Sequence, residues 1–146
     1  MRVLNSFAAI ATLLALVAPL TAQQVRIKGA TPSDVVRAVN NELSSQGFKL
    51  EDSSSHEARF ALDRGLVSQN RGSVVRAVPV VVELHLRFRQ KADSVLEVNA
   101  DEEVVGARGQ GSMEFRTPVR SNAERQSMQQ LLELVKNDLE ARAQKQ

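Results

Sequence analysis

The sequence predicts an α+β domain. We expect a two-layer sandwich, with an antiparallel sheet of about five strands and one N-terminal and one C-terminal helix packed on the same face. The first observation is the segment 78–90 (VPVVVELHLRFRQ), where apolar and polar side chains alternate from Val80 onward, as in a strand with one buried face. Sheets with one solvated face are usually antiparallel. The second observation is a helical apolar stripe on each side of the strand-rich middle, which gives the order α-β-β-β-β-β-α.

Residues 1–22 have the pattern of an export signal. Arg2 gives a positive start, residues 7–17 are apolar apart from Thr12, and Ala22 is a small residue suited to cleavage. The alternative is an uncleaved membrane anchor, but an apolar run of roughly a dozen residues is short for a span of about 20. We therefore expect an exported protein, periplasmic or extracellular. Its single domain is residues 23–146, with no membrane span once the signal is removed.

The first helix is predicted at residues 32–46. Thr31 is a suitable N-cap, Pro32 takes the first helical position, and the Asp34 carboxylate can reach the free backbone amides. Gly47 ends the helix in a left-handed conformation. The preceding segment, residues 23–30, is either a short strand or the end of the signal region. The apolar stripe of the helix consists of Val35, Val36, Val39 and Leu43.

Strands are expected at 48–51, 56–63, 78–90 and 95–104, followed by a last strand that contains Met113 and Phe115 and ends at Pro118. Residues 64–77 are ambiguous. They either extend the neighbouring strands as a β-ribbon, which we favour, or form a mobile loop. Pro79 lacks an amide hydrogen, which fits the start or the edge of a strand.

The C-terminal helix begins after Ser121, which forms a capping box with Glu124. The tail 142–146 is polar, and we expect it to fray. The apolar stripe of this helix consists of Met128, Leu131, Leu132, Val135 and Leu139. Phenylalanines supply the aromatic part of the expected core, and those of the mature chain all fall on the apolar side of predicted strands: Phe48, Phe60, Phe88 and Phe115.

Composition and motifs argue against several functions. The net charge is +2 and there is no cysteine, so nucleic acid is not expected as a partner and the fold relies on its core without disulfides. The segment His56-Glu57-Ala58-Arg59-Phe60 lacks the second histidine of a zinc-protease motif. The glycines from Gly106 to Gly111 do not match the dinucleotide fingerprint and predict a flexible hairpin connection. No serine stands in a G-x-S-x-G elbow. We expect no enzyme, no cofactor and no metal site.

The candidate binding residues lie on the solvated face of the central strand and in the glycine-rich connection: Glu83, His85, Arg87, Arg89 and Arg108. A turn at Lys91–Asp93 would place His85 opposite Asn99, and a turn at Ala92–Ser94 would place it opposite Asp101. In either register, basic groups of one strand meet acidic groups of the next. This pattern fits a solvated lattice of ion pairs, or a surface that binds carboxylate or phosphate groups.

These observations favour an exported, non-catalytic envelope protein that binds another macromolecule, with a protein of the cell envelope as the expected partner. Its binding surface would be the polar sheet face or a free sheet edge that accepts a strand. The alternative is a carrier that holds a lipid or another small apolar ligand between its helices and its sheet.

Overall fold

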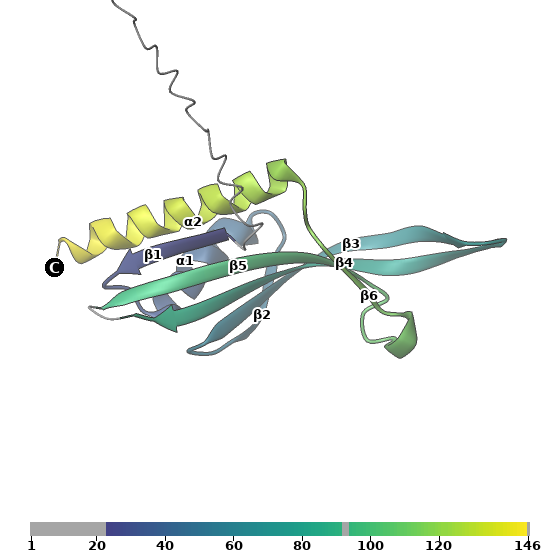
Figure 1. Cartoon of the computed structure of the whole chain (residues 1–146), viewed down its shortest axis with the longest axis horizontal. Helices are drawn as coiled ribbons and strands as arrows, with labels where there is room; N and C mark the ends of the chain where they lie inside the picture. The colour runs from purple at the N-terminus through teal and green to yellow at the C-terminus, as the bar shows by residue number, and fades with distance from the viewer. Residues whose placement is uncertain (1–22, 92–93, 146) are drawn as a thin grey trace, which may run out of the picture.

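The computed structural model describes residues 23–91 and 94–145, so the predicted signal peptide, residues 1–22, lies outside the described residues. The predicted α+β sandwich is confirmed: an antiparallel sheet and two helices pack together (Figure 1). In chain order, the elements are β1 (Gln23–Lys28), α1 (Pro32–Ser44), β2 (Lys49–Ser53), β3 (Glu57–Arg71), β4 (Val74–Gln90), β5 (Val95–Gly106), the 3₁₀ turn η1 (Gly111–Met113), β6 (Phe115–Pro118) and α2 (Asn122–Ala143).

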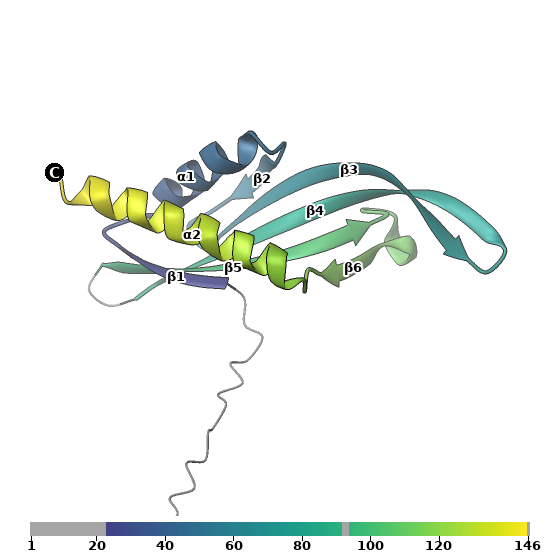
Figure 2. The ribbon, with the colours of Figure 1, turned by 90° about the horizontal axis from the view of Figure 1, so that it is seen from above.

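The sheet is built around β4, the strand that the alternating pattern predicted. The strand order is β1-β5-β4-β3-β2, and β6 pairs with β5 on the same edge as β1. Residues 23–28 form strand β1 before the first helix. The sheet therefore has six strands instead of about five, and the chain enters the domain with a strand and not with a helix (Figure 2). Strand β6 begins at Phe115. Met113 lies before it in η1 and is 37% exposed, so its predicted place on the apolar side of the last strand is wrong.

The main core lies between the helices and one face of the sheet. Alternate residues of β4 and β5 point into it, and the predicted apolar stripes of both helices meet them. Phe48, Phe60 and Phe88 lie in this core, where each contributes about 1.5–3 kcal/mol by burial. Phe115 packs instead in a second, smaller cluster with Val78, Val80 and Ala107.

Both helices start at the predicted caps. Thr31 and Asp34 form a capping box, in which Thr31 N donates to Asp34 Oδ2 at 3.0 Å, and hydrogen bonds from Thr31 lower the pKa of this aspartate. Ser121 Oγ accepts from Glu124 N at 3.2 Å. Helix α1 ends at Ser44, and α2 ends at Ala143, inside the tail that we expected to fray. Neither helix of the described chain is long and apolar enough to cross a membrane.

The register between β4 and β5 places Arg89 opposite Glu97 and His85 opposite Asp101. It therefore corresponds to the predicted turn at Ala92–Ser94 and not to the turn at Lys91–Asp93, although residues 92–93 lie outside the described residues.

Strands β3 and β4 continue beyond their neighbours as a two-stranded ribbon. Strand β2 pairs with β3 only as far as Ala61, and β5 pairs with β4 only from Val80 onward. We call residues 66–79 the arm, because they project from the end of the sandwich (Figures 1 and 2). Gly72 has φ +63° at the first position of its two-residue turn, which a type II′ hairpin requires. The ribbon that we favoured for residues 64–77 is confirmed.

Candidate functional site

Glu83 lies at the centre of the polar sheet face, which is the face of β4 opposite the helices. We expected this side chain to be exposed, and that prediction is wrong, because Glu83 is 0% exposed. Two arginines from the segment after β5, Arg108 and Arg116, cover it. The other predicted binding residues of β4 share this face and are less buried: His85, Arg87 and Arg89.

Three cationic or hydrogen-bonding groups contact the Glu83 carboxylate. Arg108 Nε lies 2.7 Å from Glu83 Oε1, and Arg116 Nη1 lies 3.0 Å from Oε2. His85 Nε2 is also 3.0 Å from Oε2. We call these four residues the Glu83 cluster. Oε1 is held by the Arg108 ion pair alone, since no hydrogen bond of good geometry reaches it.

The two arginines extend the cluster to three further carboxylates. Arg108 donates two hydrogen bonds to Glu51 on β2, at 2.7 and 2.5 Å. Arg116 donates to Glu114 at 2.9 Å and to Glu103 at 3.3 Å. Each guanidinium therefore joins Glu83 to at least one other carboxylate, so the cluster links β2, β4, β5 and β6.

The glycine-rich connection positions Arg108. Ala107 adopts φ +51° and its N–H donates to Pro79 O at 2.9 Å, which turns the chain out of β5. Gly109 N donates to Glu114 Oε2 at 2.8 Å and so closes the loop. The predicted hairpin connection thus serves a second purpose, because it carries a guanidinium onto the polar face.

The charges of the cluster keep Glu83 ionised. Burial raises the pKa of Glu83, but hydrogen bonds from Arg116 and His85, together with the charge of Arg108, outweigh it, so the net pKa lies below its ordinary value. The hydrogen bonds with Glu83 raise the pKa of Arg116. At neutral pH the carboxylate of Glu83 is therefore ionised and paired with the guanidinium groups of Arg108 and Arg116, and Glu83 is not suited to act as a general acid.

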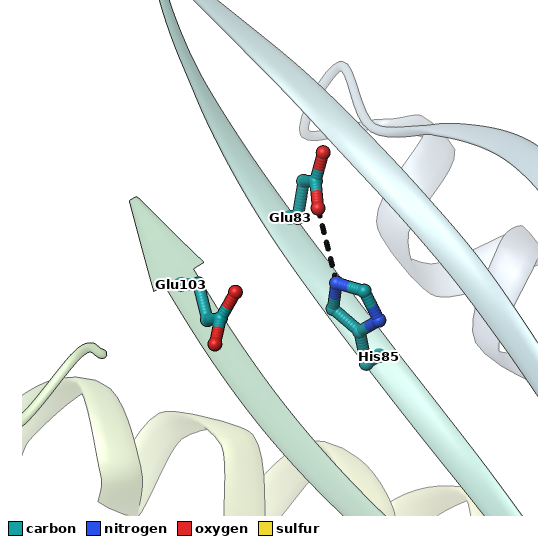
Figure 3. A group of neighbouring side chains, drawn as sticks. All are labelled: Glu83, His85 and Glu103. Carbon is teal, nitrogen blue, oxygen red and sulfur yellow. Dashed lines mark hydrogen bonds and ion pairs between the residues drawn. The ribbon is translucent and has the colours of Figure 1, made fainter. Parts of the chain in front are cut away.

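Glu83, His85 and Glu103 place ligand-type atoms within 4.8 Å of one another (Figure 3). However, Arg116 Nη1 lies 3.0 Å from Glu83 and 3.3 Å from Glu103. The guanidinium already supplies the positive charge that these carboxylates need, and a metal ion would have to displace it. The chemistry of the group therefore favours an arginine-centred ion network over a metal site.

The remaining predicted residues stay on the open part of the polar face. Arg87 pairs with Asp101, and its side chain is 62% exposed. Arg89 is exposed opposite Glu97, which is itself buried and is contacted by Arg26 and Lys91 at 3.3 and 3.5 Å. Of the five candidates, the structure therefore brings three together in the Glu83 cluster: Glu83, His85 and Arg108.

A cleft of about 720 Å³ adjoins this open part of the face. It lies at the β5 edge, where β1 pairs as far as Ala100 and β6 pairs from Glu103 onward. Basic and acidic side chains line it in similar numbers, so its charge favours no one class of ligand. Its polar-face lining includes Glu57, His85, Arg87, Asp101 and Glu103.

Sequence reasoning missed Arg116, which contacts both Glu83 and Glu103. A signal for it existed: Phe115 was assigned to the apolar face, so its neighbours Glu114 and Arg116 belong on the polar face by strand alternation. No sequence pattern indicated that Glu51 and Arg108 would form an ion pair. The two residues are far apart in the sequence, and they meet only because a tight turn brings Arg108 onto the polar face.

The arm is a second candidate site, and it differs in character. It exposes large apolar side chains on both of its faces. Leu66 and Val75 lie on one face and are 72% and 66% exposed, while Val67 and Val74 lie on the other and are 47% and 49% exposed. The sandwich itself buries most side chains of this kind, so their concentration on the arm is typical of a binding surface.

No model of a known protein family matches the sequence, and neither does any curated protein sequence.

Proposed function

We propose that this chain is an exported, non-catalytic protein of the cell envelope, periplasmic or extracellular, that binds another protein through its arm. One observation carries the proposal: residues 66–79 project from the sandwich with Leu66 and Val75 mostly exposed on one face. Exposing such side chains to water is unfavourable, and a partner that covers them recovers the hydrophobic contribution.

The ion pairs of the Glu83 cluster favour a structural role for this part of the polar face over a role in binding. Its carboxylate is buried and fully charge-compensated, so binding an anion or a cation there would first require breaking the existing ion pairs. Arg87 and Arg89 are exposed and remain a predicted second contact surface. The arm carries more exposed apolar surface than this face and is the stronger candidate.

The carrier function remains an alternative without a specific observation in its favour. The space between the helices and the sheet is occupied by buried core side chains, of which Val35, Val39, Leu84 and Leu132 are at most 1% exposed. A ligand held there would have to displace packed core residues, which is costly at the packing density of protein interiors.

The test is gentle purification of the protein from its native envelope, followed by native mass spectrometry. Three forms are compared: the wild type, the arm variant Leu66→Ser/Val75→Ser, and the polar-face variant Arg87→Glu/Arg89→Glu. The arm substitutions lie outside the core, so the arm variant should keep the wild-type melting temperature.

We expect residues 23–146 with a bound protein in the wild type and the polar-face variant, and loss of that protein in the arm variant. Retention by the arm variant would reject the arm as the binding site. Loss in the polar-face variant alone would assign binding to Arg87 and Arg89. A small bound ligand in place of a protein would support the carrier. N-terminal sequencing of the same material tests cleavage after Ala22.

A further inference from the structure

The arm has a free backbone edge. Phe88 N donates to His56 O on the β3 side, and Ala107 N donates to Pro79 O on the β5 side. The backbone N–H and C=O groups of successive residues point to opposite edges of a strand. In β4, those of the even-numbered residues therefore point toward β3, and those of the odd-numbered residues point toward β5. Val75 and Ala77 therefore direct N–H and C=O groups to the side where, within the described chain, no strand pairs with them.

The opposite edge of the arm, along β3, is less suited to accept a strand. A register shift between Asp63 and Gly65 interrupts the ladder at its base. Such bulges twist an edge strand away from flat pairing and protect it from strand addition. The extra residue of this bulge, Arg64, lies in β3, whereas β4 pairs with β3 from Val74 to Arg87 without an inserted residue.

A groove adjoins the β4 edge. It has a volume of about 280 Å³, and a mixture of apolar and basic side chains forms its walls. Met113 of η1 is one wall, and Val74, Arg76 and Val78 of β4 form the other, with Gln69 beside them. An extended segment that paired at Val75 and Ala77 would continue the sheet where β5 stops, with alternate side chains directed toward this groove.

The charge of this region selects the partner. The arm, residues 66–79, contains two arginines, Arg71 and Arg76, and no aspartate or glutamate. A second copy of this chain would be a poor occupant, because antiparallel pairing of two such edges about Arg76 brings the two Arg76 residues opposite each other. A segment with acidic side chains would complement the charge.

Lipid is also a poor occupant of the whole arm. In the apolar part of a bilayer, the N–H and C=O groups of Val75 and Ala77 would have no hydrogen-bond partner, which is the reason open sheet edges do not occur there. A protein strand satisfies these groups and covers the exposed valines at the same time.

We infer that the β4 edge of the arm, at Val75 and Ala77, binds an extended, acidic and partly apolar segment of the partner protein by strand addition. This inference rests on the proposed function and specifies how the partner is held and what its binding segment is made of.

Two proline variants test the mode of binding. Ala77→Pro removes an outward N–H from the β4 edge. Ser68→Pro removes one from the β3 edge at the position directly opposite, because Ser68 pairs with Ala77. The probe is a synthetic peptide that alternates valine with glutamate, and its counterpart alternates valine with lysine. Fluorescence anisotropy measures both peptides with the mature chain and with each variant.

We expect the glutamate peptide to bind at least about tenfold more tightly than the lysine peptide. Ala77→Pro should weaken binding of the glutamate peptide by at least about tenfold, whereas Ser68→Pro should change its affinity by no more than about twofold. No binding of the glutamate peptide, equal binding of the two peptides, or greater sensitivity to Ser68→Pro would overturn the inference. Flotation with vesicles of phosphatidylglycerol and phosphatidylcholine is the lipid test. Vesicle binding that is lost in Leu66→Ser/Val75→Ser would overturn it in favour of a membrane.

The same proline variants in the envelope purification separate this inference from the proposed function. A partner that is lost with Leu66→Ser/Val75→Ser but retained with Ala77→Pro would leave the arm as the binding site and reject strand addition. A partner retained by every arm variant would reject the proposed function itself.

Discussion

At the scale of single residues, the polar face is dominated by one buried carboxylate. Glu83 has lost contact with water, and it remains ionised because Arg108, Arg116 and His85 surround it. A buried charge of this kind adds little net stability compared with an apolar residue, but removing it leaves its partners uncompensated. Glu83 therefore fixes the position of the segment that carries the two arginines.

Replacing Glu83 with glutamine should lower the free energy of unfolding by about 1–3 kcal/mol at pH 7, because Arg108 and Arg116 would lose their shared anion. The pKa of Glu83 is lowered in the folded state, so its stabilisation is complete above the ordinary value of 4.5 and is lost as the pH falls through the lowered pKa. Urea unfolding at pH 7 and pH 3 measures the difference, which should shrink at the lower pH. Glu103→Gln is the control: this residue is partly exposed, and within the described chain its carboxylate forms an ion pair with Arg116 alone, so the substitution should cost at most about 1 kcal/mol. A loss for Glu83→Gln no larger than that of the control would contradict the assignment.

Glu102 shows the opposite behaviour. Burial raises its pKa, and the neighbouring charge of Glu124 raises it further, although Arg64 opposes them. The ionised form is therefore disfavoured in the folded state, and it reduces stability at pH values above the raised pKa. This cost disappears as the pH falls below the unfolded value of 4.5.

Glu102→Gln should consequently unfold at a higher urea concentration than the wild type at pH 7, and at the same concentration at pH 3. Equal midpoints at pH 7 would show that the ionised Glu102 carries no penalty in the fold. An NMR titration of the Glu102 carboxyl carbon checks the direction of its pKa independently.

At the scale of elements, the pairing of β5 with β6 depends on a contact between one glycine and one aromatic ring. Gly106 pairs directly with Phe115, and a Cβ at position 106 would lie 2.0 Å from the Phe115 ring. The ring covers the bare glycine and closes the small cluster around Val78 and Val80. This contact places β6, and therefore Arg116, next to Glu83.

Gly106→Ala should destabilise the fold by about 1–3 kcal/mol, because the methyl group overlaps the ring and β6 must move. The double variant Gly106→Ala/Phe115→Ala removes the overlap, so the glycine substitution should cost less in that background. A double-mutant cycle in urea measures the coupling. Strictly additive losses would mean that β6 adjusts without a clash.

Element β4 combines two environments in one strand. Its residues from Val80 onward lie between β3 and β5, whereas residues 74–79 pair, within the described chain, only with strand β3. Pro79 lies at this boundary. The backbone of Pro79 points toward the β5 side, where β5 has already ended at Gly106. Proline has no N–H to donate there, so β4 can continue through a residue that is not tolerated at the centre of a sheet.

At the scale of the whole molecule, stability is distributed unevenly between the sandwich and the arm. Leu84 and Leu86 are 0% exposed in the main core, while the arm is a two-stranded ribbon with apolar side chains in water. Isolated ribbons of this kind are only marginally stable. The arm should therefore open without unfolding the sandwich.

Hydrogen exchange tests this prediction. Amides of the arm should exchange on the order of 100-fold faster, or more, than those of Leu84 and Leu86, because only the latter require global opening. Equal protection would indicate that the arm is covered in solution. Repeating the measurement at several protein concentrations would then show whether a second copy covers it.

The sequence by itself determined the architecture of the sandwich. Alternation in residues 78–90 identified the central strand and its two faces, and the caps at Thr31 and Ser121 set the helix starts. These features depend on local periodicity and on hydrogen bonds between residues a few positions apart, which are present in the order of the residues. The same alternation placed Glu83, His85, Arg87 and Arg89 on one face.

Only the tertiary structure decided which of those residues meet and which are buried. Glu83 followed a pattern typical of exposed residues, yet a turn at Ala107 brings Arg108 over it, and Arg108 also binds Glu51, which lies 57 positions from Arg108 in sequence. The free edge at Val75 and Ala77 likewise exists because β5 stops pairing at Val80. Both features depend on where a different segment ends or turns, and the alternation within β4 contains no information about that.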